Sequence, residues 1–227
     1  MRAKINVLVP NRIKNSVSDA NFCVFYAVSD AEIEIRLDGI VGDEYTQSDA
    51  GSINKVLAAN RDKPVTLRVN SFGGLAFDGL AIHNALADHP APTTGIIESV
   101  AASAASLAVL GADRVKIYSN AVYQIHEGIA GAWGHIADLQ DTIDWLKTFN
   151  AAATATYAAK TGKSEAEIEK WLLGAHGDGT KFTAQQALEA GFVDEVITAG
   201  AGKKPKAQSP TMRDRALRQQ IEFLKRC

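Results

Sequence analysis

The sequence predicts an α/β protein built from stacked βα units around a largely parallel sheet. From residue 31 onward, short apolar runs alternate with longer segments of helical periodicity, which is typical of strands covered by helices. The first such run alternates Ile33, Ile35 and Leu37 at the period of two that indicates a strand. The chain has 227 residues, 46% of them hydrophobic, and can therefore bury a full core as one domain.

The first βα unit lies at residues 32–60. Residues 32–42 are predicted as a strand that ends in a turn at glycine. Residues 48–60 place their apolar side chains on one face, which predicts a helix with Ser48 or Asp49 as its N-cap.

The second unit carries a glycine pair between its strand and its helix. Residues 65–69 form a β-branched run that leads into NSFGG, residues 70–74, and residues 77–89 resume helical spacing. Glycines at such a junction can expose backbone N–H groups to an anion or a developing oxyanion, because no Cβ blocks the approach. A plain tight turn also explains the pair. The phosphate-loop patterns G-x-G-x-x-G and G-K-[ST] are not found in it.

The third unit contains a run of small residues, SVAASAAS, at residues 99–106. Residues 93–100 are predicted as a strand, and residues 102–112 as a small-residue helix closed by Gly111. A serine at a strand-to-helix turn is a candidate nucleophile, because the helix N-terminus stabilises an anion and small neighbours admit a substrate backbone. Close packing of the helix on the sheet is the alternative reason for the same residues. The nucleophile elbow G-x-S-x-G is not present.

A serine nucleophile needs a general base, and His126 is the candidate among five histidines. Residues 114–126 predict two short strands, and His126 ends the second, where a sheet can hold a side chain rigidly. A purely structural histidine would fit the same place. No histidine pair has the spacing H-E-x-x-H, and the two cysteines, Cys23 and Cys227, are too few for a zinc site. We therefore expect neither a metal nor a cofactor.

The last third of the chain is mainly helical. Residues 135–162 predict one long helix with a broad apolar stripe. Two shorter helices and a final strand follow, at residues 164–176, 183–191 and 192–197. We expect the folded domain to span residues 31–198, between an N-terminal arm or edge segment at 1–30 and a linker with a basic helix or tail at 199–227.

Composition excludes several classes of partner. The formal net charge is only −2, which gives no electrostatic reason to bind nucleic acid or a membrane surface. No run approaches the roughly 20 apolar residues of a membrane span, and the first residues have no apolar core of signal-peptide length. The two cysteines imply no disulfide framework and favour a reducing compartment. We expect a cytoplasmic protein.

The order of these motifs resembles that of the Clp protease proteolytic subunit, a serine peptidase family with a Clp-protease/crotonase-like fold. The resemblance covers residues 33–197 and rests on NSFGG, then VAASAAS, then a strand ending in QIH, then a long helix and the turn GDGTKFTAQQA. In particular, the sequence resembles the phage-encoded branch, the Clp-related head maturation proteases. The phrases IHEGIAGAWG and FTAQQALEAGFVDEV carry this finer likeness.

The resemblance implies a role for each matching residue. Ser103 would attack the scissile carbonyl, and His126 would take its proton and return it to the leaving amine. The backbone N–H groups of Gly74 and Ala104 would form the oxyanion hole. The acid that orients the histidine is expected just before FTA at residues 182–184.

The third catalytic residue is left open by the sequence. The matching position is Gly179, so we expect the neighbouring Asp178 to orient the imidazole, with Thr180, a backbone carbonyl or a water as alternatives.

The resemblance also implies partners. In relatives the long helix is a handle by which rings interlock, so the chain is expected to form a homo-oligomeric ring, a heptamer or double ring, around its protein or peptide substrate. Core packing is the other explanation of the apolar stripe. Capsid or scaffold proteins are the expected substrates during head assembly, and a cellular subunit working with an ATP-dependent unfoldase is the alternative. Any ATP would be bound by that partner.

The sequence leaves open two alternatives to a peptidase. Crotonase-like enzymes that act on CoA thioesters also use a two-amide oxyanion hole, but they need a carboxylate base, for which Glu98 is a candidate. A catalytically silent assembly scaffold is the other alternative.

Overall fold

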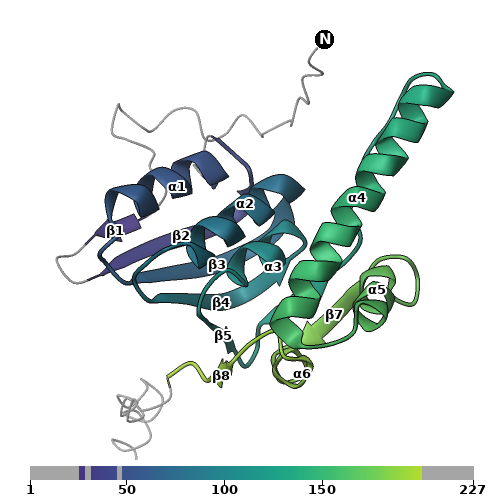
Figure 1. Ribbon diagram of the computed structural model, residues 1–227. Helices are drawn as coiled ribbons and strands as arrows, with labels where there is room; N and C mark the ends of the chain where they lie inside the picture. The colour runs from purple at the N-terminus through teal and green to yellow at the C-terminus, as the bar shows by residue number, and fades with distance from the viewer. Residues whose placement is uncertain (1–25, 29–31, 45–47, 201–227) are drawn as a thin grey trace, which may run out of the picture. The chain divides into compact units, whose positions relative to one another are not determined.

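The computed structural model describes residues 26–28, 32–44 and 48–200, and those up to Ile197 belong to one compact unit. The arm or edge segment expected at residues 1–30, apart from Tyr26–Val28, and the linker and tail expected at 199–227, apart from residues 199–200, lie outside the described residues. Helices and strands alternate along most of this unit, as the sequence predicts (Figure 1).

A single eight-stranded sheet organises the unit. Its main path runs, in spatial order, through β1 (Tyr26–Val28), β2 (Ile33–Val41), β3 (Val65–Gly74), β4 (Thr93–Ala102), β5 (Arg114–Tyr118) and β8 (Glu195–Ile197). All neighbours on this path are parallel except β1, which is the antiparallel edge strand. The parallel α/β class predicted from the sequence is confirmed.

The strand β4 pairs with two different strands along its length. Its first half pairs with β5, whereas its last residues pair in parallel with β6 (Val122–Ile125). The short strand β7 (Thr180–Thr183) then pairs antiparallel with β6. Two segments distant in sequence thus flank the end of β4.

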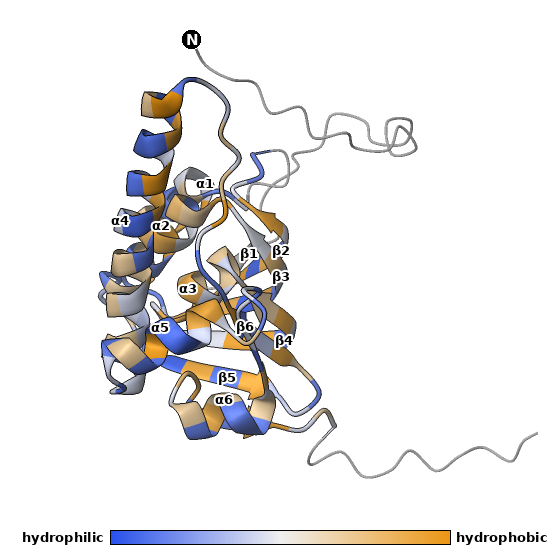
Figure 2. Ribbon diagram, turned by 90° about the vertical axis from the view of Figure 1, so that its right-hand side faces the viewer, coloured by the Kyte–Doolittle hydropathy of each residue, from blue (hydrophilic) through white to orange (hydrophobic). Residues whose placement is uncertain are grey.

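The helices cover one face of the sheet and one end of it. Helices α1 (Ala50–Ala59), α2 (Ala76–Ala87) and α3 (Ala104–Val109) lie on the same face of the main path (Figures 1 and 2). Asp49 caps α1 by accepting from the Ser52 amide, which decides between the two caps expected there. The remaining helices are α4 (Ile136–Thr161), α5 (Glu165–Leu173) and α6 (Ala184–Ala190). No helix within the described ranges is both long and apolar enough to cross a bilayer.

Several boundaries differ from the sequence prediction. NSFGG belongs to β3 and ends it, and β4 extends to Ala102, so that only Ser103 separates it from α3. The strand β7 falls where only a turn was expected, because it is formed by pairing with β6 rather than by any pattern of its own. The final strand is limited to Glu195–Ile197, since the Phe192 amide still bonds to Ala187 of the preceding helix.

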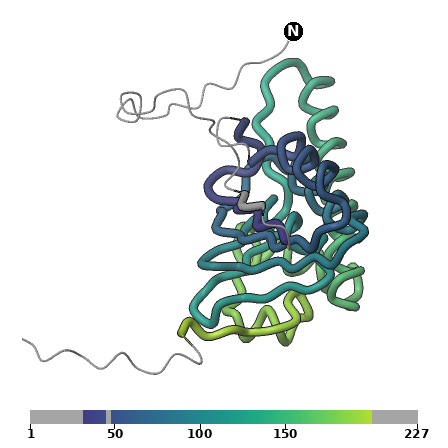
Figure 3. The backbone as a smooth tube through the Cα atoms, turned by 90° about the vertical axis from the view of Figure 1, so that its left-hand side faces the viewer, coloured from purple at the N-terminus to yellow at the C-terminus, as the bar shows by residue number. Residues whose placement is uncertain are grey.

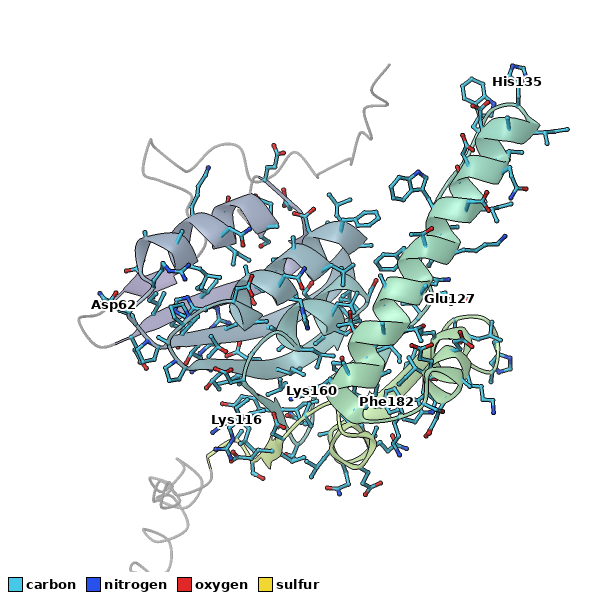
Figure 4. The ribbon with its side chains drawn as sticks, in the orientation of Figure 1. Asp62, Lys116, Glu127, His135, Lys160 and Phe182 are labelled. Carbon is cyan, nitrogen blue, oxygen red and sulfur yellow. The ribbon has the colours of Figure 1, made fainter. Side chains whose placement is uncertain are left out.

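An aromatic cluster joins β6 and β7 to the helices. Tyr123 of β6 packs 4.8 Å from Phe192 between ring centroids, and Phe182 of β7, labelled in Figure 4, lies 5.1 Å from the same ring. Tyr157 of α4 and Trp171 of α5 complete the group at 5.9 and 5.7 Å from Phe192. Each such pair contributes about 0.5–1.5 kcal/mol beyond its buried area, so the cluster holds β6 firmly against α4.

The long helix α4 packs on the core with only its C-terminal half. Phe149, Ala153 and Tyr157 are buried, and Lys160 lies at the end near the sheet. The N-terminal half extends past the sheet layer to His135, with apolar and polar residues alternating along it (Figures 2 and 4). Ile136 in this half is 86% exposed. Core packing therefore explains only half of the apolar stripe.

Candidate active site

Ser103 occupies the turn between β4 and α3 in a strained conformation. Its φ of 55° and ψ of −129° make it the sole non-glycine residue with a positive φ in the described part of the chain. Such a conformation costs about 1–3 kcal/mol and persists only where its surroundings impose it. Here the Ser103 amide donates to the Gln124 carbonyl at 3.1 Å, and the Ser103 carbonyl accepts from the Ser106 amide at 2.9 Å.

The alanines around Ser103 are buried. Ala101 and Ala105 are fully buried, and Ala104 is 2% exposed. A Cβ on Gly79 of α2 would lie only 2.5 Å from the Ala104 carbonyl oxygen, so α2 and the start of α3 approach closely. The small residues therefore serve packing as well as exposing Ser103.

The glycine pair at the end of β3 lies directly against Ser103. Gly73 has a φ of 102°, and a Cβ there would lie 2.5 Å from the Ser103 Cβ. The Gly73 amide donates to Ser71 Oγ at 3.0 Å, and that hydroxyl donates to the Gly39 carbonyl at 2.6 Å. Ser71 is buried and so fixes the pair relative to β2, and Gly74 lines the same cavity as Ser103.

His126 follows β6 directly and lies near Ser103 because of strand register. Ala102 of β4 pairs with Gln124 of β6, and the ends of parallel neighbours meet at the same edge of a sheet. Nδ1 of His126 lies 2.5 Å from the Glu127 carbonyl oxygen. A carbonyl can only accept, so Nδ1 carries the proton and Nε2 of the neutral ring is an acceptor. This is the tautomer that can take a proton from a serine hydroxyl.

One cavity brings four predicted residues together. Gly74, Ser103, Ala104 and His126 all line a cavity of about 330 Å³. Within the described ranges no hydrogen bond joins the two side chains of Ser103 and His126, and catalytic hydrogen bonds often form only when substrate is bound. The other lining residues are mainly apolar: Leu75, Ala76, Leu107, Glu127, Gly128, Ile129, Phe149, Ala153 and Tyr157.

The structure does not bring the Asp178 carboxylate to the histidine. Asp178 Oδ2 accepts from Lys181 Nζ at 2.7 Å, and this hydrogen bond holds the pKa of the Asp178 carboxyl below its usual range. The Asp178 side chain is 57% exposed and is not among the residues that line the cavity. The hydroxyl of Thr180, the alternative, donates to the Trp171 carbonyl at 2.7 Å.

Gly179 lies beside His126 but leaves no room for a side chain. Its φ is 78°, and a Cβ there would lie 2.0 Å from the Ile125 carbonyl oxygen and 2.4 Å from the His126 Cβ. An acidic side chain at this position would displace the histidine. The chain therefore holds the imidazole without an acid at residue 179.

A chain of buried hydroxyl groups is hydrogen-bonded to the backbone of the turn that contains Ser103. Ser106 Oγ donates to the Ser103 carbonyl at 2.6 Å and lies 2.7 Å from the Tyr157 hydroxyl, which donates to it in turn. The Tyr123 hydroxyl donates to the Ser106 carbonyl at 2.9 Å. Burial raises the pKa of both tyrosines, so both remain neutral donors.

Glu98 does not act at this cavity. Its two carboxylate oxygens accept from Arg36 at 2.6 Å and from Arg68 at 3.0 Å. The hydrogen bond that Arg36 donates to Glu98 raises the pKa of Arg36, which also donates to Asp38. Both carboxylate oxygens are thus bound by arginines, and Glu98 is not among the residues that line the cavity, so this geometry gives no support to the CoA-thioester chemistry considered for Glu98.

Sequence reasoning missed Glu127, Asn150 and Tyr157. The contacts of the first two join segments 22 and 23 residues apart, and no pattern in the chain marks such pairs. Tyr157 falls within the apolar stripe of α4, where its hydroxyl gives no separate signal. The run of small residues that begins at Asn150, NAAATATYAA, is the sequence signal that this part of the helix packs closely on the core.

A strained serine, a histidine with an acceptor Nε2 and two nearby amides form the arrangement of a serine hydrolase. The sequence model of the Clp protease family matches residues 23–200. The chain belongs to this family and is a serine-type peptidase with the Clp-protease/crotonase-like fold.

Similar proteins include three that are named ATP-dependent Clp protease proteolytic subunit 2. That of Thermobifida fusca is 30% identical over 161 residues, 70% of this chain and 77% of that protein. That of Mycolicibacterium paratuberculosis is 29% identical over 170 residues, 74% and 83% of the two chains. The Tropheryma whipplei protein is 30% identical over 154 residues, 63% and 81%.

Proposed function

We propose that this protein is an endopeptidase in which Ser103 is the nucleophile and His126 the general base. The observation that carries this proposal is the Nδ1 hydrogen bond of His126, because it leaves Nε2 as an acceptor in the cavity that Ser103 lines.

Peptide hydrolysis would proceed in two halves. Ser103 Oγ attacks the scissile carbonyl carbon while His126 Nε2 takes the hydroxyl proton, and the imidazolium then gives this proton to the leaving amine. The acyl group remains on Ser103 Oγ. Water attacks the ester with His126 again as base, and the second product leaves with a free carboxylate.

The amides of Gly74 and Ala104 would stabilise the oxyanion of each tetrahedral intermediate. Both residues line the cavity, and their neighbours are anchored, Gly73 through Ser71 and Ser103 through Gln124. Amides fixed in this way need no reorganisation when charge develops on the substrate. Loss of one such donor typically lowers kcat by about 100- to 1,000-fold.

The Glu127 carbonyl would orient His126, which is the backbone-carbonyl alternative of the sequence analysis. Asp178 as the orienting acid stays a prediction, and the Asp178→Asn variant tests it. Loss of a true triad acid lowers kcat by about 10⁴-fold. With the carbonyl as the orienting group, Asp178→Asn keeps activity close to that of the wild type.

The substrate would be an extended or unfolded polypeptide with an apolar side chain beside the scissile bond. The cavity next to Ser103 is lined by Leu107, Ile129, Phe149 and Tyr157, and such a lining favours apolar over charged side chains.

Assembly into a ring, a heptamer or a double ring, would enclose the serines. The support is the exposed apolar surface of the handle, defined here as α4 before Phe149 together with the extended segment 127–134 that runs beside it (Figures 1 and 3). Trp133 is 97% exposed and Ile129 86%. Apolar surface of this kind usually marks a protein–protein contact.

Two natural roles fit such a peptidase. Cleavage of capsid or scaffold proteins during phage head maturation is the role that the sequence resemblance favours. The names of the similar proteins favour the alternative, a cellular subunit that receives chains from an ATP-dependent unfoldase. Degradation of a folded, tagged protein only in the presence of an unfoldase and ATP would favour the second role.

Hydrolysis assays with an unstructured protein such as casein test the proposal. The wild type is expected to release peptides, and Ser103→Ala and His126→Ala are expected to release none while keeping the wild-type circular dichroism spectrum. Equal hydrolysis by wild type and Ser103→Ala would rule out this site. A folded oligomer without any peptidase activity would support the silent-scaffold alternative instead.

A further inference from the structure

Asn150 of α4 binds the peptide group that orients His126. Its Oδ1 accepts from the Gly128 amide at 2.8 Å. That amide belongs to the same peptide unit as the Glu127 carbonyl, which accepts from His126 Nδ1. We propose that Asn150 is a positioning residue for catalysis, which acts through this one peptide group; the inference rests on the proposed function of His126 as the general base.

The geometry of a trans peptide makes this coupling direct. The N–H and C=O bonds of one peptide unit are coplanar and point in opposite directions. Fixing the Gly128 N–H on Asn150 therefore aims the Glu127 C=O away from α4 and toward the imidazole. Hydrogen bonds in series also polarise one another, so the bond from Asn150 strengthens the carbonyl as an acceptor for His126.

Further contacts leave this peptide little freedom. The Glu127 amide donates to the Leu172 carbonyl of α5 at 3.2 Å, and Asn150 Nδ2 donates to the Glu127 carboxylate at 3.3 Å. A Cβ on Gly128 would lie 2.8 Å from the Phe149 ring, so the backbone lies directly on α4. Figure 4 shows Glu127 beside the middle of this helix.

In this arrangement Asn150 serves the purpose of a triad carboxylate, which is to fix the tautomer and orientation of the histidine. Gly179 has no space for a carboxylate, and the Asp178 carboxylate binds Lys181. A side-chain amide and one peptide group then hold the Nδ1–H tautomer in place of a charged residue. Loss of the Asn150 acceptor removes the hydrogen bond on the Gly128 N–H, so the peptide plane tilts between its remaining contacts and the ring loses its fixed orientation.

Three variants test this role. Asn150→Leu keeps the side-chain size but removes the acceptor. Asn150→Asp combined with Glu127→Gln keeps the acceptor and restores a donor–acceptor pair between the two side chains. Gln185→Leu, on the exposed face of α6, is the matched control for exchange of a helical amide for leucine. The readouts are fluorophosphonate labelling of Ser103, kcat and KM on a peptide, melting temperature, and ¹⁵N NMR of the His126 ring.

In Asn150→Leu, labelling of Ser103 and the kcat on the peptide are expected to be about 10- to 100-fold slower than in the wild type. A small misplacement of a catalytic group produces losses in this range. The KM and melting temperature of Asn150→Leu stay near the wild-type values, and its His126 spectrum shows mixed tautomers. Gln185→Leu behaves like the wild type, and the double variant recovers most of the rate that Asn150→Leu loses. Wild-type rates and an Nδ1–H tautomer in Asn150→Leu would overturn the proposal, as would a folded double variant as slow as Asn150→Leu. If wild-type Ser103 is not labelled, the proposed function fails, while the tautomer comparison still decides the role of Asn150.

Discussion

The buried hydroxyl chain behind Ser103 makes a quantitative prediction for Ser106 and Tyr157. In Tyr157→Phe, Ser106 Oγ keeps its bond to the Ser103 carbonyl and loses only the bond from the phenol. One such neutral hydrogen bond contributes about 0.5–1.5 kcal/mol, so we expect a loss of about 1 kcal/mol in the free energy of unfolding.

Ser106→Ala is expected to cost more, because it leaves a buried group without a partner. Tyr157 is 1% exposed, and its hydroxyl would have lost its acceptor. The lost hydrogen bond to Ser103 and the Tyr157 hydroxyl left without an acceptor together lower the free energy of unfolding by about 2–3 kcal/mol. In the double variant, Ser106→Ala with Tyr157→Phe, no phenol remains, and the free energy of unfolding falls by about 2 kcal/mol. This loss is about 1–2 kcal/mol smaller than the sum of the two single losses.

Urea unfolding at fixed protein concentration measures the four free energies, and melting curves provide a check. For a domain of this size 1 kcal/mol corresponds to about 2–4 °C, so Ser106→Ala should melt about 4–12 °C below the wild type. Strict additivity of the two losses would refute the proposed hydroxyl chain, as would a Ser106→Ala variant as stable as Tyr157→Phe.

Three further predictions follow from other contacts. Because burial raises the folded-state pKa of Tyr123 and Tyr157, the folded protein holds protons that the unfolded chain releases above pH 10, so stability should fall with rising pH there, by up to about 1.4 kcal/mol per pH unit for each tyrosine. Urea midpoints between pH 8 and 11 measure this, and a flat profile would contradict it. Gly179→Ala should abolish labelling of Ser103 in a probe assay, since its Cβ would displace His126, the proposed general base; unchanged labelling would be inconsistent with the tight contact. Leu139→Glu with Ile143→Glu should lower the oligomer mass in sedimentation without loss of helicity, because both side chains are partly exposed and apolar; an unchanged mass would place assembly elsewhere.

The sequence predicted the parts of this protein that local patterns determine. Strand and helix periods gave the order of the βα units, and the motif order placed Ser103, His126, Gly74 and Ala104 at strand ends that the structure brings around one cavity. Parallel strands explain why these four residues lie around one cavity, because the carboxyl ends of parallel strands meet at the same edge of a sheet.

Features that depend on pairs of distant segments could not be predicted in this way. The strand β7 exists through its pairing with β6, and the contact of Asn150 with Gly128 joins residues 22 positions apart. The apolar period of α4 likewise cannot distinguish a face buried in the core, such as Phe149, from one that is exposed, such as Ile136. The group that His126 Nδ1 contacts is a backbone carbonyl, which no residue type reveals.

Mapping a fluorophosphonate adduct by mass spectrometry tests the assignment of the nucleophile most directly. The probe is expected to modify Ser103 alone in the wild type, to leave His126→Ala unmodified, and to modify Asp178→Asn at nearly the wild-type rate. An adduct on another serine such as Ser99 or Ser106, or a folded wild-type protein that takes up no probe, would contradict the assignment.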